Sequence, residues 1–231
     1  MKSPQSARLG DLLGRVGIVT WFTHDAILKA FAIYADVLAW LANAPDSSAL
    51  RILSQMGNLA FLALIVATTI FRLQPLQSAE GLAPRIAAFA GTFALLFLNM
   101  MPPTISLPPA LTVFALCLLL TGFVLSAYVL YWLGRSFSIM AEARRLVTAG
   151  PYAIVRHPLY MTEEIAIIGF LLLNLSIPAM LLGVLHWALQ LRRMHHEEQV
   201  LRAAFPEYEH YAAMTPKFFP RLNAAPVRKP P

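Results

Sequence analysis

"ALTVFALCLLLTGFVLSAYVLYWL", residues 110–133, is a run of 24 residues without a charged side chain. A helix needs about 20 apolar residues to cross the hydrocarbon core of a bilayer, so this run is long enough to span one. The whole chain has the same character, because 58% of its 231 residues are hydrophobic and only 13% are charged. No apolar segment alternates in the way that strands of a membrane barrel do. The sequence therefore predicts an all-α, polytopic helical membrane protein.

Further apolar segments lie on both sides of this run. They cover residues 17–43, 51–72, 85–101, 161–174 and 177–191. The last two are short and are separated by "NLSIP", in which Pro178 suits the first turn of a new helix. We therefore expect a C-terminal helical hairpin, and five to six transmembrane segments in total.

The basic residues are distributed unevenly between the connecting segments. Of 18 Lys and Arg residues, 16 lie in four segments that fall on one side when alternate loops are assigned to the two membrane faces: residues 1–16, 72–85, 134–160 and 192–231. The positive-inside rule makes this side cytoplasmic. We expect an inner or plasma membrane protein whose termini and active site face the cytoplasm. The scattered charges do not form the basic face that nucleic acid requires, so no nucleic-acid partner is expected.

The first apolar segment carries ionisable residues at membrane depth. Asp25, Lys29 and Asp36 are spaced four and seven residues apart, which places them on one helical face and allows Asp25 and Lys29 to pair. Charged groups are costly in lipid, so this face should point away from it. It is either a helix-packing stripe or the lining of a substrate path.

The stretch "GPYAIVRHPLYMTEE", residues 150–164, interrupts the apolar pattern. Gly150 and Pro151 break the chain, and Pro158 disfavours helical geometry at His157. An ordered loop with free backbone groups should therefore lead into the hairpin. His157 would lie at the membrane boundary in this loop, beside Tyr152.

A second polar cluster, residues 195–222, follows the hairpin on the same predicted side. On a helix, Leu201 lies four residues after Glu197 and three after Glu198, so a carboxylate can face a site while Leu201 anchors the helix. Two polar, aromatic segments thus flank one short hairpin. Their arrangement predicts a pocket that the C-terminal part of the chain closes.

The histidines in this cluster do not indicate a metal centre. His195 and His196 are adjacent, so on a helix their side chains point about 100° apart and do not readily share one ion. Cys117 is the single cysteine and lies within an apolar run, which leaves no thiolate cluster or disulfide framework. We expect no metal site.

These motifs, taken in order, resemble those of the isoprenylcysteine carboxyl methyltransferase and phospholipid methyltransferase superfamily. The similarity covers about residues 128–222 and rests on "GPYAIVRHPLY", the apolar hairpin, "EEQVL", "YEHY" and "TPKFFP". It implies a methyltransferase core within residues 134–222, preceded by N-terminal transmembrane helices in residues 1–133 and followed by a disordered tail in residues 223–231.

The resemblance also implies a cofactor, S-adenosylmethionine, held between the loop and the helix that carries E-E-x-x-L. Its ammonium group and ribose hydroxyls would need a carboxylate, and its own carboxylate would need cationic or backbone donors. Its sulfonium would need aromatic faces. The residues of this chain that match the cofactor-binding motifs are Gly150, Tyr152, Arg156, His157, Pro158, Tyr160, Glu197 and Glu198. Tyr208, Tyr211 and Pro220 match the positions that follow.

The chain departs from the family pattern at two places that bear on catalysis. Thr162 stands where the family commonly has Gly, and Glu163 and Glu164 follow it. These carboxylates either cap the helix that begins there or act as a base or amine-binding group. Lys217 stands where the family commonly has Arg and keeps the charge without the bidentate fork, so it is a candidate for holding a substrate carboxylate.

The methyl acceptor stays open at this point. The bilayer itself and a lipophilic or small-molecule acceptor, such as a prenylcysteine carboxylate, a phospholipid amine or a thiol, are the expected partners; the oligomeric state is not specified. A reductase of the sterol-reductase type is the main alternative, because basic residues near the hairpin could bind the 2′-phosphate of NADPH. A non-enzymatic helical membrane protein would leave the paired motifs unexplained.

Overall fold

The computed structural model describes residues 4–44, 48–94 and 104–220, and it is mostly helical. The last part of the expected segment at 85–101 and the expected tail at 223–231 lie outside the described residues. The helices are α1 (Pro4–Leu41), α2 (Ala49–Ile70), α3 (Ala83–Phe93), α4 (Pro109–Leu133), α5 (Pro158–Leu173), α6 (Ile177–Ala204) and α7 (Tyr208–Met214). Short 3-10 helices occupy Gly134–Ser136 and Gly150–Ala153.

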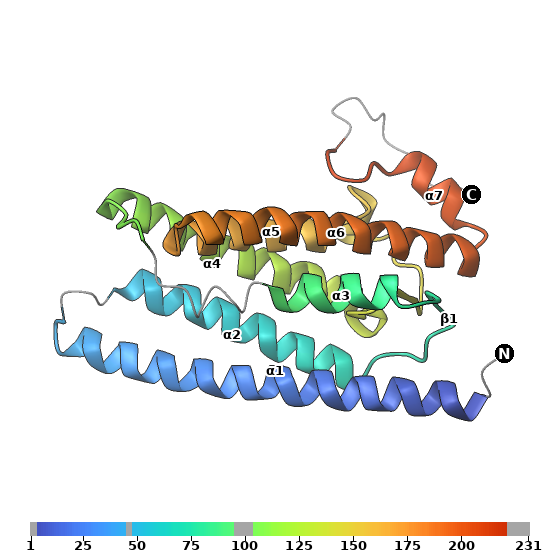
Figure 1. The fold of residues 1–231 in the computed structure, drawn as a ribbon, viewed down its shortest axis with the longest axis horizontal. Coiled ribbons are helices and arrows are strands. Elements are labelled where there is room, and N and C mark those ends of the chain that lie inside the picture. Colours follow the sequence, from blue (N-terminus) through green and yellow to red (C-terminus); the bar gives the residue numbers. More distant parts are fainter. Residues whose placement is uncertain (1–3, 45–47, 95–103, 221–231) are drawn as a thin grey trace.

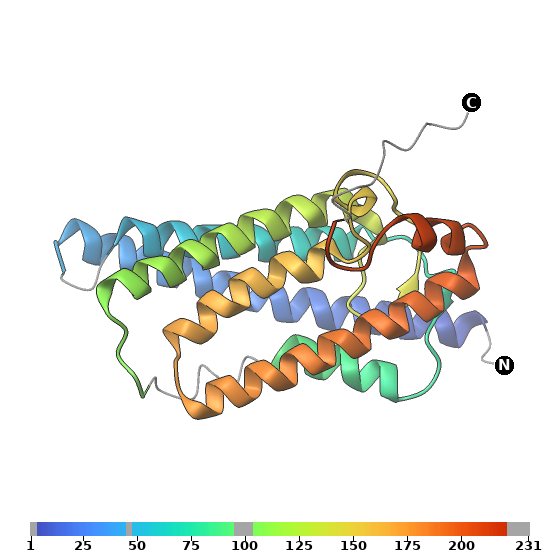
Figure 2. The same ribbon diagram turned by 90° about the horizontal axis from the view of Figure 1, so that it is seen from above.

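The long helices form an elongated bundle with roughly parallel axes (Figures 1 and 2). Helix α1 packs on α2, α2 packs on α4, and α4 packs along α5. Helix α3 packs on α6 at the other side of the bundle. Helices α1, α2 and α4 each contain a stretch long and apolar enough to cross a membrane: Asp11–Leu41, Ala49–Ile70 and Pro109–Ser136. The helical membrane class is therefore as expected, whereas a total of five to six spans stays a prediction.

The expected hairpin is present, and its second helix is longer than the apolar pattern indicated. The Ser176 hydroxyl caps α6 by accepting a hydrogen bond from Ala179 N at 3.2 Å, and Pro178 lies in the first turn of that helix. Helix α6 then continues without a break to Ala204. The second arm of the hairpin and the E-E-x-x-L motif are thus parts of one continuous helix, α6.

The described parts of the four segments with most of the Lys and Arg residues, 4–16, 72–85, 134–160 and 192–220, meet at one end of the bundle (Figure 1). Two-residue strands join two of these segments there: β1 (Gln77–Ser78) pairs antiparallel with β2 (Glu142–Ala143). Backbone hydrogen bonds extend the pairing on both sides, from Leu76 N to Ala143 O at 2.7 Å and from Ala79 N to Ala141 O at 2.9 Å. This small sheet is an exception to the expected all-α fold. It forms because the two loops lie side by side in space, which local sequence does not reveal.

A buried ion cluster ties α1 to the same end. The Asp11 carboxylate lies 2.7 Å from Arg72 Nη2 and 3.0 Å from Arg144 Nη2, and Arg15 pairs with it from the next turn of α1. Arg144 also pairs with Glu142. Buried charges are tolerated only when they are paired in this way, so the cluster fixes the N-terminal helix to two distant loops.

The ionisable face of α1 points into the protein, as the sequence predicted. The Asp36 carboxylate accepts hydrogen bonds from Arg51 Nε at 3.0 Å and from Gln55 Nε2 at 2.6 Å, both on α2. Asp25 and Lys29 lie on the wall of an internal cavity. No ion pair joins these two within the described residues, so the cavity, and not the expected pairing, accounts for their position.

The closest helix packing is between α4 and α5, and it depends on small residues. A Cβ atom at Gly122 would lie 2.3 Å from the backbone nitrogen of Ala166, and one at Gly169 would lie 2.6 Å from Ala115 O. Thr162 continues this seam by accepting a hydrogen bond from the Ser126 hydroxyl at 3.0 Å. Small and hydroxyl side chains let the two backbones approach closely.

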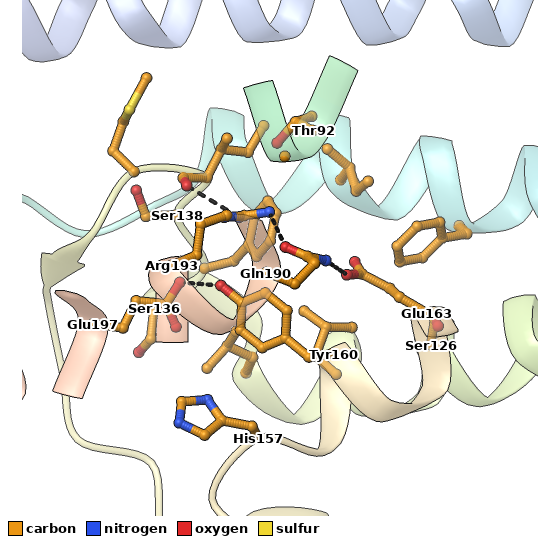
Figure 3. Close-up of a pocket in the computed structure, with 18 of the residues that line it drawn as sticks. Thr92, Ser126, Ser136, Ser138, His157, Tyr160, Glu163, Gln190, Arg193 and Glu197 are labelled. Carbon is orange, nitrogen blue, oxygen red and sulfur yellow. Dashed lines mark hydrogen bonds between the residues drawn. The ribbon is translucent and has the colours of Figure 1, made fainter. Parts of the chain in front are cut away.

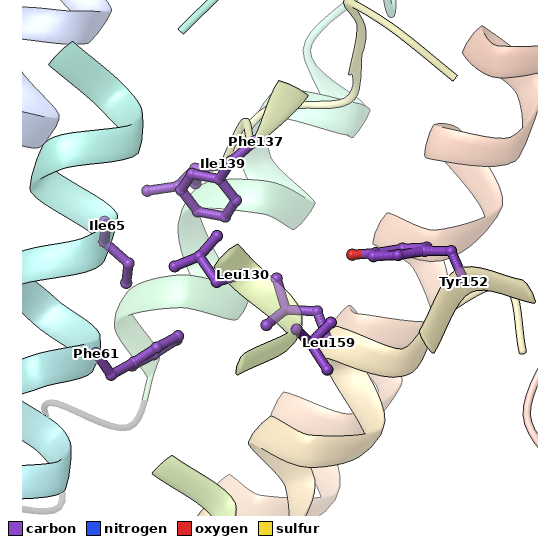
Figure 4. Packing of buried hydrophobic residues seen from close by; sticks show 8 residues of the cluster. Phe61, Ile65, Leu130, Phe137, Ile139, Tyr152 and Leu159 are labelled. Atoms are coloured by element: carbon purple, nitrogen blue, oxygen red, sulfur yellow. The ribbon is translucent and has the colours of Figure 1, made fainter. Parts of the chain in front are cut away.

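A cluster of buried hydrophobic residues packs the loops against the helices (Figure 4). Leu130 of α4 is fully buried, and it packs with Phe61 and Ile65 of α2 and with Leu159 of α5. Phe137, Ile139 and Tyr152 come from the loops and join the same cluster. The loops that carry the polar motif are therefore packed onto the membrane helices and held in place by them.

Replacement of Gly122 by Ala should destabilise the protein, because the added methyl group has no space against Ala166. We expect a loss of about 1–3 kcal/mol, the usual cost of overpacking, measured as a lower thermal transition in detergent. Gly17→Ala is the matched control, because nothing lies within 4 Å of a Cβ atom there and alanine favours a helix. Equal transitions for the two variants would contradict the close packing of α4 and α5.

Candidate functional site

A cavity of about 400 Å3 lies between the helices at the end where the loops meet. Its volume falls within the range of small-molecule sites, about 300–1,000 Å3. Polar side chains of α5 and α6 converge on one part of it (Figure 3). Aromatic and aliphatic side chains of α2 and α4 line another part. One cavity thus joins a polar region at the loops to an apolar region between membrane helices.

Residues 150–157, here called the RHP loop, form one side of the polar region. Gly150 has a φ of +60°, and a Cβ atom there would lie 2.5 Å from the Trp132 ring. Gly150 therefore lets the loop pack on the end of α4, and it is not part of the cavity lining. Tyr152 does line the cavity, and its carbonyl oxygen accepts a hydrogen bond from the Tyr211 hydroxyl at 2.7 Å.

His157 and Pro158 connect the RHP loop to the hairpin. Pro158 is the first residue of α5, where its missing N–H costs no hydrogen bond, and His157 adopts the non-helical conformation that precedes it. The His157 side chain is buried, and its Nε2 lies 2.9 Å from Glu198 Oε1. The loop is thereby joined directly to α6.

Glu198 is surrounded by cationic groups. Besides His157, its carboxylate oxygens lie 3.5 Å from Arg156 Nη2, 3.6 Å from Arg202 Nη2 and 3.9 Å from Lys217 Nζ. Burial opposes ionisation of Glu198, but the hydrogen bond with His157 and the charge of Arg156 outweigh it and lower the pKa of the carboxyl group. We call this group of residues the Glu198 cluster.

The Glu198 cluster holds the C-terminal part of the chain over the RHP loop. Arg156 N donates to Pro216 O at 2.9 Å, and Arg156 Nη1 donates to Ala212 O at 3.4 Å. We call this covering of the RHP loop by residues 205–220 the closure. Lys217 contributes to it, because its Nζ lies 3.9 Å from Glu198 Oε1 and 5.6 Å from the centre of the Phe218 ring. Neither Glu198 nor Lys217 lines the cavity. A direct contact of these two residues with cofactor or substrate stays a prediction, and their observed contacts are structural.

Glu197, the neighbour of Glu198, faces the cavity. Its Oε1 accepts a short hydrogen bond from the Tyr160 hydroxyl. The Tyr160 ring is covered by the guanidinium of Arg193, 5.2 Å from the ring centre, and meets the His157 ring edge-on at 5.7 Å. Of the two adjacent glutamates, Glu197 is therefore the one that a bound molecule would meet.

A row of polar side chains leads from Tyr160 into the bundle (Figure 3). Arg193 Nη1 donates to Gln190 Oε1 at 2.9 Å, and Gln190 Nε2 donates to Glu163 Oε2 at 3.4 Å. Arg193 Nη2 also donates to Ile139 O at 3.1 Å, which fixes the guanidinium. Sequence reasoning missed Gln190 and gave Arg193 no place in this site. Their spacing from Glu197, seven and four residues on one face of α6, was the signal that could have identified them.

Glu163 and Glu164 occupy different surroundings. Helix α5 begins at Pro158, so both lie beyond its first turn, and the interpretation that they cap the helix is wrong. Glu163 lines the cavity, whereas Glu164 points to His186 of α6, with Oε1 3.5 Å from Nε2. Glu163 is thus the carboxylate of this pair that can meet a substrate.

The polar region has unused hydrogen-bonding groups that suit a bound polar molecule. The Tyr208 hydroxyl and the Ser136 hydroxyl are buried on the cavity wall and have no hydrogen-bond partner within the described part of the chain. Burial raises the pKa of Tyr208 well above its usual value and the pKa of Tyr211 to about 12, so both phenols keep their protons at neutral pH. A carboxylate, hydroxyl donors and aromatic rings are the set that S-adenosylmethionine requires.

Comparison with known proteins defines the class of this site. Residues 110–208, from the start of α4 to the start of α7, match the family model for phospholipid methyltransferase. The match includes the RHP loop, the hairpin and the E-E-x-x-L helix. This region is therefore similar to phospholipid methyltransferases.

Three curated relatives match over part of their length, and the name of one of them, the plant protein, indicates a methyltransferase. Protein-S-isoprenylcysteine O-methyltransferase B of Arabidopsis thaliana is 32% identical over 117 residues, which is 48% of this chain and 59% of that protein. Nickel-cobalt-cadmium resistance protein NccN of Alcaligenes xylosoxydans xylosoxydans is 39% identical over 83 residues, 36% of this chain and 39% of that protein. Cobalt-zinc-cadmium resistance protein CzcN of Cupriavidus metallidurans is 40% identical over 79 residues, which is 34% of this chain and 37% of that protein.

The matched part of the chain therefore spans about two fifths of the two resistance proteins and about three fifths of the plant protein. The resemblance of this region to the isoprenylcysteine carboxyl methyltransferase and phospholipid methyltransferase superfamily, which the motifs indicated, is confirmed by these comparisons.

Replacement of Glu198 by Gln should loosen the closure formed by residues 205–220. Removal of one partner from a buried ion cluster costs about 3–5 kcal/mol, because the remaining cations are left uncompensated. If this cost lowers the free energy of local opening, hydrogen exchange in residues 208–217 should accelerate about 10²- to 10³-fold or more.

Glu209→Gln is the matched control, because Glu209 is 70% exposed and pairs only with Arg202 at 3.0 Å. Acid should act as the Glu198 substitution does: with a lowered pKa, the stabilisation is complete at neutral pH and is lost as the pH falls through that lowered value. Unchanged exchange in Glu198→Gln would show that the cluster does not hold the closure.

Proposed function

We propose that the protein is a membrane methyltransferase that transfers a methyl group from S-adenosylmethionine to a lipophilic or small membrane-soluble acceptor. The observation that carries this proposal is the single cavity that joins Glu197, Tyr160 and the RHP loop to the apolar space between α2, α4 and α5. A charged cofactor and an apolar acceptor can meet there, and the similarity of residues 110–208 to phospholipid methyltransferases supports the same reaction class.

The polar region would bind the cofactor. S-adenosylmethionine, when bound, supplies a methyl group that is already activated by attachment to a sulfonium. Glu197 can accept hydrogen bonds from ribose hydroxyls or from the ammonium group. Tyr208 and Ser136 can donate to its oxygen and nitrogen atoms, and the rings of Tyr152 and Tyr160 can face the sulfonium. Gly150 and Glu198 support this wall from behind.

The apolar region would bind the acceptor. Phe61, Leu62 and Ile65 of α2 line the cavity, as do Ile167 and Phe170 of α5. These side chains suit an alkyl or prenyl chain, which would enter from the bilayer between the helices. The acceptor's reactive atom would then lie near Glu163, where the apolar wall meets the polar row.

Positioning and exclusion of water are what the protein would contribute to the rate. Methyl transfer is an in-line displacement, so alignment of the two reactants and a preorganised polar site supply most of the acceleration. The closure of residues 205–220 over the RHP loop keeps bulk water from the polar region. No catalytic triad or bound metal is needed for this step.

The distribution of basic residues favours a cytoplasmic site, because 16 of the 18 Lys and Arg residues lie in the four sequence segments that the predicted topology assigns to the side of the RHP loop. We infer that the loop end of the bundle faces the cytoplasm; a reporter fused at the C-terminus and active only outside the cytoplasm would contradict the inference.

The reductase alternative is less well supported by the site. Arg193 is engaged with Gln190 and Ile139 O, and Arg202 and Lys217 lie by Glu198. The carboxylate of Glu197 faces the cavity and would repel the 2′-phosphate of NADPH.

Calorimetry with the purified protein should detect saturable binding of S-adenosylmethionine and no binding of NADPH. Glu197→Gln should weaken the binding of S-adenosylmethionine about 10- to 100-fold, since a hydrogen bond to a charged group contributes about 1.5–3 kcal/mol. Glu207→Gln is the control, because Glu207 is exposed and outside the cavity lining. Binding of NADPH alone by the folded parent protein would favour the reductase and overturn the proposal.

A further inference from the structure

The inner end of the cavity contains a histidine without a hydrogen-bond partner. His186 of α6 is only 3% exposed and lies on the cavity wall. Neither of its ring nitrogens makes a hydrogen bond within the described residues, although Nε2 lies 3.5 Å from Glu164 Oε1. An unsatisfied polar group is costly in a buried place, so a ligand is the natural partner for this ring.

Glu163 lines the same cavity and is held in an unusual way for a carboxylate between helices. No Lys, Arg or His nitrogen lies within 4.0 Å of it among the described residues, in contrast to Glu198, which has Arg156, Arg202, Lys217 and the His157 ring within that distance. Its only hydrogen bond comes from the neutral amide of Gln190, at 3.4 Å to Oε2. The other oxygen, Oε1, is left for a group in the cavity.

The orientation of the Gln190 amide is fixed by its other partner. Arg193 has no acceptor atoms, so the atom of Gln190 that it meets at 2.9 Å must be the oxygen. The amide nitrogen of Gln190 therefore points to Glu163 and donates to it. Arg193 itself is committed to Gln190, to Ile139 O and to the Tyr160 ring, so its fork is not presented to the inner end of the cavity.

We propose that Glu163, His186 and Gln190 form the binding site for the head group of the methyl acceptor, and that this head group is a nucleophile that carries a proton, an amine or a thiol on an apolar chain. Glu163 accepts the proton, and His186 supplies a second polar contact. The inference rests on the proposed methyltransferase function and names the acceptor class for it.

The reaction balances with these groups. A lone pair on the nitrogen or sulfur of the acceptor forms the new bond to the methyl carbon, and the bond from that carbon to the sulfonium sulfur breaks with its electron pair going to sulfur. The proton of the acceptor goes to Oε1 of Glu163, which becomes a neutral carboxylic acid. Amines and thiols are protonated near neutral pH, as the values of about 10.4 for lysine and 8.5 for cysteine indicate, so a base is needed.

A carboxylate head group fits the inner end poorly. It would lie against Glu163, with Glu164 on the next residue of α5, and like charges in a buried place repel strongly. It also has no proton to lose, which would leave Glu163 without a role. Ile167 and Phe170 follow Glu163 on the cavity side of α5 and provide the surface for the apolar chain.

The test compares three probes with the same ten-carbon chain: decylamine, decanethiol and decanoic acid. The parent protein should methylate the amine or the thiol, and it should not methylate the acid. Glu163→Gln should lower turnover about 10²- to 10⁴-fold, the usual contribution of general base catalysis. Glu163→Asp keeps a carboxylate and should retain part of the rate. Glu80→Gln, an exposed glutamate outside the cavity lining, is the control and should keep the parent rate.

Probe binding is measured separately as the rise in thermal transition temperature that each probe causes. The accepted probe should stabilise the parent protein, and the rise should fall in His186→Leu. Methylation of decanoic acid, a Glu163→Gln rate within threefold of the parent, or binding of S-adenosylmethionine without transfer to either the amine or the thiol would each overturn the inference. Absence of S-adenosylmethionine binding in the parent would instead overturn the proposed function itself.

Discussion

The arrangement of the site depends on one buried carboxylate, Glu198. Its oxygens lie within 4 Å of cationic groups from the RHP loop, from α6 itself and from the C-terminal segment. A charge in this position would be very unfavourable alone, and with these partners its pKa is lowered. Because the partners come from three separate parts of the chain, the same interaction that satisfies the charge also assembles the wall of the cavity.

The two pairs of adjacent glutamates show how a helix divides roles between neighbours. Successive side chains point about 100° apart, so Glu197 faces the cavity while Glu198 faces the closure. On α5, Glu163 faces the cavity while Glu164 faces His186. In each pair one carboxylate lines the cavity and the other, Glu198 or Glu164, does not. The polar row between Glu163 and Tyr160 then joins the two helices across the site.

Much of the fold follows from the sequence because its determinants are local. Apolar length identified the helices, Pro178 located the start of α6, and the order of the motifs indicated that the RHP loop and the E-E-x-x-L helix meet. The ion cluster at Asp11 and the pairing of β1 with β2 were not predicted, because they join residues more than 60 positions apart. Local patterns contain no information on such contacts.

The same limit applied within the site. Four residues that match the motifs, Tyr152, His157, Tyr160 and Glu197, line one cavity, and their contact with a cofactor stays a prediction. Motif matching did not separate Glu197 from Glu198, and it missed Gln190, because the direction of a side chain depends on how α6 is rotated against its neighbours. Gly150, another motif residue, acts through its packing on Trp132.

The most direct test of this account is to locate the cofactor by ultraviolet crosslinking of S-adenosylmethionine labelled in its methyl group to the purified parent protein, followed by mass spectrometry of the labelled peptides. The account predicts label on peptides from residues 150–160 or 197–211, whose tyrosines line the cavity. Label confined to peptides that contribute nothing to the cavity wall would contradict it.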